Sequence, residues 1–213
     1  MKLKKLKFLL FLFGISCHSY AFQTGGTATL TENLLRGGIF LSFQWREVDS
    51  PKGEKFTSIG SHLFLGISPK RWLCGYVFGG FSDMKFDEED FHSPLGPKFG
   101  GGIKFSVSPG SNVGLNFDGQ FAYQHNSDGK SLNYYELQSF LTISYRYANL
   151  YVYGGLSISQ SWLDFSSEKD YTANNPFGVV VGMDYFVTPI LFVTAEMHNF
   201  DKDVVYIGIG FTP

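Results

Sequence analysis

The sequence predicts an all-β fold in which about ten strands, or eight as the alternative, form one up-and-down antiparallel transmembrane β-barrel. Three observations carry this prediction. Aromatic residues make up 18% of the 213 residues and there are 25 Gly, whereas charged residues make up 17% against a usual ~25%. Bulky apolar residues alternate with small or polar ones along most of the chain. Short connections between these stretches alternate with long ones.

The composition excludes several other classes of protein. Intrinsic disorder goes with few aromatic residues and a high net charge, and neither holds here. Two Cys are too few for a disulfide-stapled mini-protein. A helical bundle is disfavoured because Gly and aromatic residues weaken helices. The net charge is mildly acidic, which argues against a nucleic-acid partner.

The N-terminus predicts a secretory signal peptide over residues 1–21. Residues 1–7 carry four Lys and no acid, an apolar run follows at 8–15, and Ser19 and Ala21 are small residues before a cut at Phe22. Removing this leader leaves 192 residues with 13 basic and 19 acidic side chains, a net charge of −6. Under the alternative interpretation as a lipoprotein signal, Cys17 is the acylated residue.

We expect residues 22–34 to be a flexible polar segment and residues 35–213 to form the barrel. The clearest strand is 113–124, where five of six odd-numbered residues are large and apolar or aromatic and no even-numbered residue is. The same alternation, weaker in four of the segments, predicts the other strands at 39–46, 58–67, 71–82, 98–107, 135–146, 151–163, 177–185, 190–200 and 204–212.

The connections predict a meander of neighbouring strands. We expect short turns at 68–70, 109–112, 148–149 and 188–189. Longer polar connections are expected at 49–55, 83–97, 125–133 and 164–176, with a short one at 201–203. No βαβ pattern, long-period repeat or linker interrupts this order, which indicates a single domain.

The residues on the two faces of the strands indicate which face of the sheet contacts lipid and which faces the interior of the barrel. One face is almost uniformly aliphatic or aromatic, and the other carries charged, amide and small side chains. An apolar interior would have to hold dozens of bulky side chains under an exterior poor in charge. An apolar exterior in lipid with a small, polar interior is typical of transmembrane barrels, whose closed sheet satisfies every backbone group.

This alternation over residues 35–213 resembles that of the small outer-membrane β-barrel superfamily, which includes OmpA-like, opacity-type and OmpX-like proteins. The resemblance is one of architecture and rests on no family-specific motif. It implies secretion to the periplasm, insertion into a bacterial outer membrane by the barrel-assembly machinery, short turns on the periplasmic side and long loops outside. The chain departs from the family in its ending, where Phe211 takes the place of a terminal aromatic residue.

The inward face predicts a lumen plugged by ion pairs, because its charges nearly balance and a barrel of this width is filled by side chains. The alternative is a narrow, porin-like channel for ions or small solutes. The residues of this expected lumen network are Arg46, Lys98, Lys104, Asp118, Glu136, Arg146, Asp184 and Glu196. Within the predicted strand 98–107, the run 100–102 is all Gly and makes room in the lumen.

Two polar groups in the expected loops are weaker candidates for chemistry. The acids Asp83, Asp87, Glu88 and Asp90 have the oxygen ligands that Ca²⁺ prefers, but they lack EF-hand spacing, and a solvated loop is the favoured interpretation. His125 and Ser127 resemble the His-x-Ser of outer-membrane lipid A deacylases, which makes a lipid-modifying enzyme the second alternative. A hairpin loop is favoured here too, because Asn, Ser, Asp and Gly form turns and Glu136 faces inward.

His198, Asp201 and Asp203 resemble part of the acid and His clusters of omptin proteases, but the second acidic pair is missing. We therefore expect no catalytic residues and no cofactor. The expected function is structural or surface-interacting, through the loops 83–97 and 164–176, with lipids and lipopolysaccharide as neighbours and a surface ligand as a candidate partner.

Overall fold

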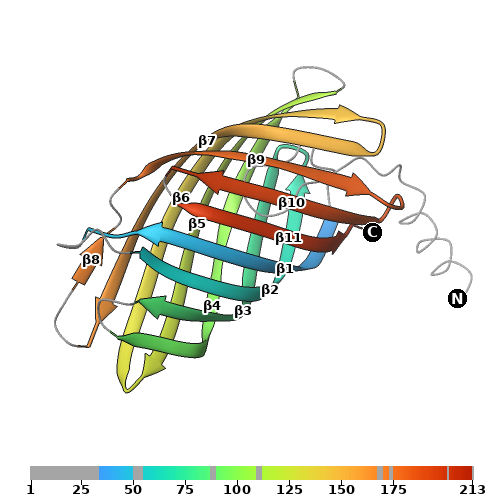
Figure 1. Cartoon of the computed structure of the whole chain (residues 1–213). Helices are drawn as coiled ribbons and strands as arrows, with labels where there is room; N and C mark the ends of the chain where they lie inside the picture. The colour runs from blue at the N-terminus through green and yellow to red at the C-terminus, as the bar shows by residue number, and fades with distance from the viewer. Residues whose placement is uncertain are drawn as a thin grey trace, which may run out of the picture.

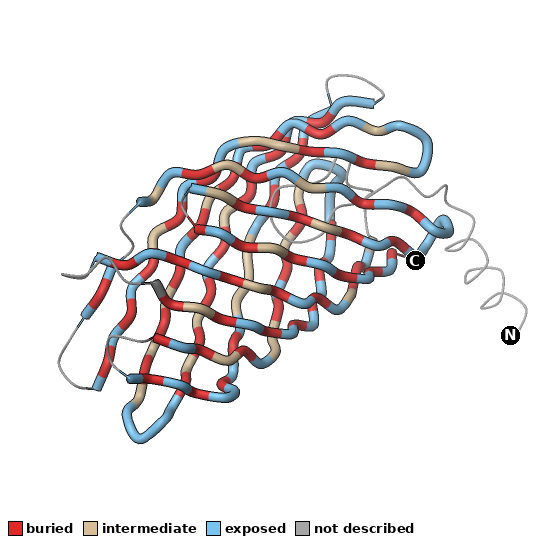
Figure 2. The backbone as a smooth tube through the Cα atoms, in the orientation of Figure 1, coloured by how far each residue is buried: buried red, intermediate tan, exposed pale blue. Residues whose placement is uncertain are grey.

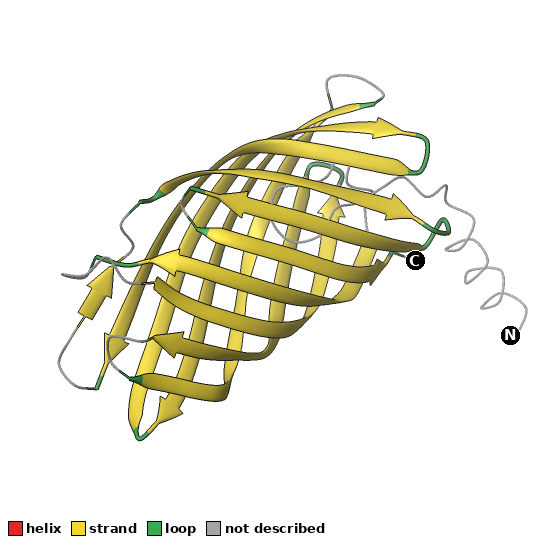
Figure 3. Cartoon of the chain, viewed as in Figure 1, coloured by secondary structure: helices red, strands yellow, loops and turns green. Residues whose placement is uncertain are grey.

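The computed structural model describes residues 34–49, 55–86, 90–108, 112–166, 170–172, 175–200 and 202–212. Every regular element among them is a β-strand (Figure 3). Within these ranges no helix is long and apolar enough to cross a bilayer. The predicted leader, Cys17, the cut before Phe22 and nearly all of the predicted segment 22–34 lie outside the described residues.

The described strands follow one another along the chain with short connections (Figure 1). Their bounds are β1 (Leu34–Glu47), β2 (Lys55–Lys70), β3 (Leu73–Phe86), β4 (Phe91–Val107), β5 (Val113–Asp128), β6 (Lys130–Tyr147), β7 (Leu150–Phe165), β8 (Asp170–Thr172), β9 (Phe177–Phe186), β10 (Leu191–Asn199) and β11 (Asp203–Phe211).

Antiparallel pairing closes these strands into a ring. Each strand from β1 to β7 pairs with the next, β7 pairs with β9, and β9, β10 and β11 lead back to β1. The short β8 pairs with only three residues of β7. Ten strands of the described chain therefore form the closed barrel, which confirms the predicted up-and-down fold and the predicted number of ten rather than eight.

Buried and exposed residues alternate along every long strand (Figure 2), as side chains that point in turn to the lumen and to the outer surface do. On β5, for example, Asn116 is 1% exposed and its neighbour Phe117 is 47% exposed. The outward positions are mostly Leu, Ile, Val and aromatic residues, as predicted for a lipid-facing surface. The period of two therefore assigns each side chain to the correct face in the central part of the strands.

The two ends of the barrel differ. At the terminal end, where β1 begins and β11 ends, the turns are short, such as Ala148–Asn149 between β6 and β7. At the opposite, distal end several strands run well past the predicted apolar band. There the β5–β6 hairpin turns through Gly129, whose φ of 67° is in the left-handed region that favours Gly.

The expected distal loops 83–97, 125–133 and 164–176 are wrong in their bounds. β3 continues to Phe86 and β4 begins at Phe91, while β5 and β6 fill most of 125–133 and β7 continues to Phe165. The Asn, Ser and Asp residues of these segments are typical of turns, yet most of them lie in strands, where buried and exposed residues continue to alternate. At the other end, the predicted turn 68–70 belongs to β2, and Arg71 and Trp72 form the turn.

A bulge in β4 shifts by one residue which of its positions face the lumen. Ser82 pairs with Gly96 and Met84 pairs with Ser93, so that β4 has one residue more than β3 over this stretch. The extra residue falls at Pro94 or Leu95, where a Pro removes no needed ladder bond. Ser93 and Lys98 consequently both face the lumen although one number is odd and the other even.

At the distal end the short strand β8 connects β7 to the residue that follows β1. One edge of β8 pairs with β7, and the carbonyl of Thr172 accepts a hydrogen bond of 2.8 Å from the Asp49 amide just beyond β1. β8 therefore lies between the distal ends of β7 and β1 (Figure 1), beyond the shorter strands β9, β10 and β11.

Candidate functional site

The lumen is the only place where many polar side chains of the described residues converge, and it is filled. Inward residues of all ten barrel strands are buried. The expectation of a small and polar interior is wrong in one respect, because aromatic rings share the lumen with the charges. Phe40, Phe64, Tyr76 and Phe78 belong to one buried group in its central part. These residues continue the inward series, and a ten-strand barrel has room for them.

The distal end of the lumen is closed by apolar side chains. We call this group the outer cluster, and its rings pack closely: Phe86 lies 5.6 Å from Phe165 and 5.0 Å from Tyr171 between ring centroids. Tyr171 is the residue that β8 contributes. The members of the outer cluster are Val48, Phe56, Met84, Phe86, Phe91, Leu132, Tyr134, Leu163, Phe165 and Tyr171.

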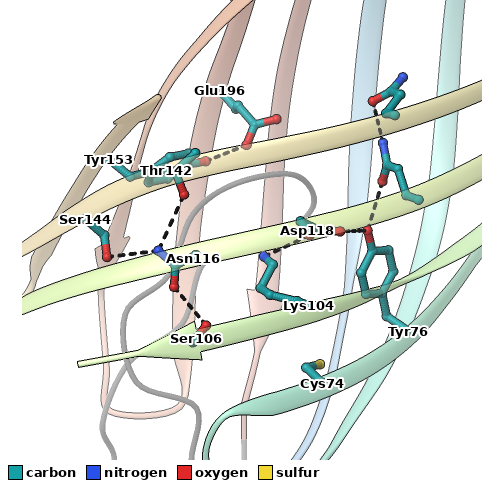
Figure 4. A network of polar contacts seen from close by, with 12 residues as sticks. Cys74, Tyr76, Lys104, Ser106, Asn116, Asp118, Thr142, Ser144, Tyr153 and Glu196 are labelled. Carbon is teal, nitrogen blue, oxygen red and sulfur yellow. Dashed lines mark hydrogen bonds and ion pairs between the residues drawn. The ribbon is translucent and has the colours of Figure 1, made fainter. Parts of the chain in front are cut away.

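The central lumen holds a network around Asp118 (Figure 4). Lys104 Nζ lies 3.4 Å from Asp118 Oδ2, and the Tyr76 hydroxyl donates to Asp118 Oδ1 at 2.7 Å. The Tyr76 hydroxyl also lies 3.0 Å from Gln120 Oε1, and Gln120 donates to Gln138 at 2.6 Å. The neighbouring strands β3 to β6 are thus linked along the inner wall of the barrel by one chain of polar contacts.

Two smaller polar groups lie beside this network (Figure 4). The side chain of Asn116 contacts Ser106 at 2.8 Å and, at longer distances, Thr142 and Ser144. In the second group, Glu196 on β10 accepts a hydrogen bond of 2.8 Å from the hydroxyl of Tyr153 on β7. The other carboxylate oxygen of Glu196 lies 2.7 Å from His198 Nε2.

A third group, which we call the distal charge cluster, consists of Arg46, Lys98, Glu136 and Lys202. Glu136 Oε1 accepts hydrogen bonds from Arg46 Nη1 at 2.6 Å and from Lys202 Nζ at 2.9 Å. Lys98 is buried, and its charge interacts with those of Glu136 and Lys202. The cluster lies directly beneath the outer cluster, because Arg46 pairs with Phe56.

The structure brings together some of the eight residues expected in the lumen network. Arg46 pairs with Glu136, and Lys104 pairs with Asp118. Glu196 contacts His198 and Tyr153 instead of a Lys or Arg. Asp184 is buried beside Thr194 and makes no ion pair among the described residues.

Arg146 lies at the terminal mouth and not within the filled lumen. Its guanidinium is 5.4 Å from the centre of the Tyr151 ring, and its Nε donates to the Ala148 carbonyl at 3.3 Å. These residues line a pocket of about 200 Å³ together with the turn between β9 and β10. Arg146 therefore stands apart from the ion pairs in the part of the chain that the structure describes.

Sequence reasoning missed two buried cations. The sequence predicts Lys202 in a polar connection, yet its side chain is buried and reaches Glu136. No sequence signal indicates this, because alternation ends where the strand ends. Arg36 is also buried. Extending the inward even-numbered series of β1 by two more positions would have found it.

His125 and Ser127 both face outward at the distal end of β5, as expected from their parity. His125 Nδ1 lies 2.9 Å from Asn133 Oδ1 on β6, and the Tyr123 hydroxyl donates to the same oxygen. Ser127 pairs with Ser131 in the hairpin. No hydrogen bond joins His125 to Ser127 within the described strands. The expected loop at this place is a pair of strands.

The structure does not bring together those candidate metal ligands that it describes. Asp83 lies on β3 and accepts a hydrogen bond from the Ile59 amide. Asp90 is fully exposed beside His92, and Asp87 and Glu88 lie outside the described residues. No group of three or more potential metal ligands occurs among the residues that were placed.

The cluster that resembles omptin proteases does not form among the described residues. His198 points inward to Glu196, and Asp203 contacts Asn199 at 2.6 Å. Asp201 is outside the described ranges.

The Gly run 100–102 lies within β4 and gives space to lumen rings. An added Cβ on Gly100 would be 2.5 Å from the Phe78 ring, and one on Gly102 would be 2.5 Å from the Tyr76 hydroxyl. Phe211 near the C-terminus lies on the outer surface, where its ring covers Gly37 of β1. Close strand packing therefore depends on Gly beside aromatic rings.

No protein-family model matches the chain, and no curated protein matches it. Among solved structures, an outer membrane channel from Pseudomonas putida F1 superposes with a TM-score of 0.54 at 9% identity, covering 92% of this chain and 100% of that one. The chain has the fold of outer-membrane β-barrels. This likeness is one of architecture and shows the fold alone.

Two autotransporter structures are more distant. The translocator domain of NalP from Neisseria meningitidis gives a TM-score of 0.49 at 11% identity, covering 85% of this chain and 89% of that one. The transport unit of AIDA-I from Escherichia coli gives 0.45 at 7% identity, covering 95% and 96%.

Proposed function

We propose that the chain is a bacterial outer-membrane protein with a closed lumen and a structural or surface-interaction role. The observation that carries this proposal is the filled interior, which the ten side chains of the outer cluster close at the distal end. A continuous water path is what a channel needs, and wide aqueous lumens belong to barrels of roughly 16 strands. With a closed lumen, the protein meets other molecules through its lipid-facing surface and its distal connections.

We infer the orientation from the difference between the two ends. We place the terminal end, with its short turns, in the periplasm and the distal end outside. The outer segments 83–97 and 164–176 then meet lipopolysaccharide or a surface ligand, mainly through the connections after β3 and β7. Insertion by the barrel-assembly machinery fits this orientation, because only the distal hairpins have to cross the membrane.

Conductance in planar lipid bilayers tests the closed lumen. We expect no stable openings from the wild-type barrel. Phe86→Ala combined with Phe165→Ala removes two packed rings of the outer cluster and should produce openings. Phe81→Ala is the matched control, since this ring lies on the same strand but is 59% exposed on the outer face. Stable wild-type openings that change on Lys104→Glu would establish a narrow channel and overturn the proposal.

Cys74 offers a second, chemical test of the same point. Its side chain is 2% exposed and faces the lumen near the terminal end. The other cysteine, Cys17, is in the predicted leader. A charged methanethiosulfonate reagent should label Cys74 only after urea unfolding, with Cys74→Ser as the blank. Labelling of the folded barrel as fast as of the unfolded chain would mean a water-filled lumen.

A further inference from the structure

The distal charge cluster has more positive than negative charge. Arg46, Lys98 and Lys202 are 1%, 5% and 3% exposed, and the one carboxylate between them, Glu136, is 2% exposed. A single oxygen of Glu136 serves both Arg46 and Lys202. The ammonium of Lys98 makes no hydrogen bond or ion pair with any residue that the structure describes. A buried net charge of this kind is costly unless a counter-ion compensates it.

Some buried polar groups of the cluster and its neighbours also have no hydrogen-bond partner among the described residues. Arg46 Nη2 donates to the Ser159 carbonyl at 2.9 Å, whereas Arg46 Nε has no partner among the described residues. The Ser159 hydroxyl is buried and equally without a partner in that part of the chain. Buried donors are nearly always satisfied, so these two groups indicate a missing acceptor next to Arg46.

We propose that the distal charge cluster binds a small free oxyanion of the class of inorganic phosphate or sulfate. Such an ion carries up to two negative charges, which match the excess of three cations over one carboxylate. Its oxygens accept hydrogen bonds from guanidinium, ammonium and hydroxyl groups, the donors that Arg46, Lys98 and Ser159 present. The ion would take the place of the acceptor that Arg46 Nε lacks.

The position of the cluster favours a free ion over a lipid phosphate. The four residues lie inside the barrel, beneath the outer cluster and behind the lipid-facing wall. Lys202 belongs to the connection between β10 and β11, two of the shorter strands of the barrel. The site needs no open lumen, and its test is independent of the conductance of the barrel.

Binding is measured on the full barrel in a phosphate-free non-ionic detergent. Equilibrium dialysis with radiolabelled inorganic phosphate should give about one bound ion per chain, and sulfate should compete. The unfolding temperature should rise by about 5 °C or more at roughly 100 times the dissociation constant, because the ion binds the folded chain only. Ionic strength is held constant with gluconate, a monovalent carboxylate that is larger than phosphate.

Substitutions of Lys98 and Glu136 should change the affinity for phosphate in opposite directions. Lys98→Met should weaken phosphate binding about tenfold to a hundredfold, and Lys98→Arg should retain it. Glu136→Gln removes the competing carboxylate and should tighten binding, which a merely damaged barrel would not do. Lys130→Met is the matched control, since Lys130 is exposed in the β5–β6 hairpin.

Three results would overturn the proposal. The first is a wild-type barrel that binds neither phosphate nor sulfate. The second is equal affinity of wild type and Lys98→Met. The third is protection by vesicles of a phosphate-bearing lipid in the absence of free phosphate, which would assign the cations to a lipid headgroup.

Discussion

Individual charges inside the barrel stabilise the fold only when their partners are in place. Asp118 and Lys104 lie 3.4 Å apart with side chains that are 0% and 5% exposed. Breaking a buried pair by removing one partner leaves the other charge uncompensated, which costs more than losing the pair as a whole. The Tyr76 hydroxyl holds Asp118 from a third strand, so the carboxylate has a fixed position.

A double-mutant cycle tests this pair. Asp118→Asn and Lys104→Met should each lower the free energy of unfolding by about 3–5 kcal/mol, whereas the double variant should lose less than the sum of the two. Urea unfolding in lipid vesicles measures these values, and the exposed Lys130→Met serves as control. Strictly additive losses would show that the two charges do not interact.

At the scale of the elements, Gly residues set how closely neighbouring strands approach. Gly80 on β3 faces inward opposite His62 of β2, and an added Cβ would clash with the Ser61 carbonyl oxygen. That atom belongs to the backbone and cannot rotate away. Gly75 on the same strand has no atom within 4 Å of such a Cβ.

The two positions therefore predict different effects of the same substitution. Gly80→Ala should destabilise the barrel by about 1–3 kcal/mol, because β2 and β3 must separate locally. Gly75→Ala should be neutral or stabilise by up to about 1 kcal/mol, because Ala restricts the unfolded chain. The urea midpoint in vesicles distinguishes them. Equal loss at both positions would contradict the close approach at Gly80.

At the scale of the whole molecule, the outer surface is the part of the fold adapted to lipid. Leu63 is 63% exposed in the middle of β2, where it pairs with Ile39 of β1 and Gly79 of β3. In water such a surface would drive aggregation, whereas in a bilayer it meets acyl chains.

A charge on this surface should be costly only at membrane depth. Leu63→Arg should destabilise the barrel in vesicles by about 2–4 kcal/mol, as expected near the bilayer midplane. Ser127→Arg, at the exposed distal tip of β5, should change stability by less than about 1 kcal/mol. If both variants behave alike, the apolar belt does not lie in the bilayer where we place it.

Much of the architecture can be predicted from sequence because alternation is local. Each strand places successive side chains on opposite faces, so parity alone assigns residues such as Asn116, Asp118 and Gln120 to the lumen without any knowledge of their neighbours. The number of alternating segments likewise predicts ten strands. The ends of the strands are predicted poorly, because turns and strands in water use the same polar residue types. The stretch 125–133 is the example, since its Asn, Ser and Asp residues lie mostly within β5 and β6.

Local alternation is sufficient to specify the β fold, the single meander, the lipid-facing residues and the charges that point inward. It does not specify which of these charges meet, and for this the closed barrel is needed. Arg46 reaches Glu136 from the opposite wall, Lys202 joins them from a connection outside any strand, and β8 contacts both β7 and the residue after β1 at the distal end. Period two sets the direction of a side chain, but contacts across the lumen depend on the closure of the ring and the paths of its connections.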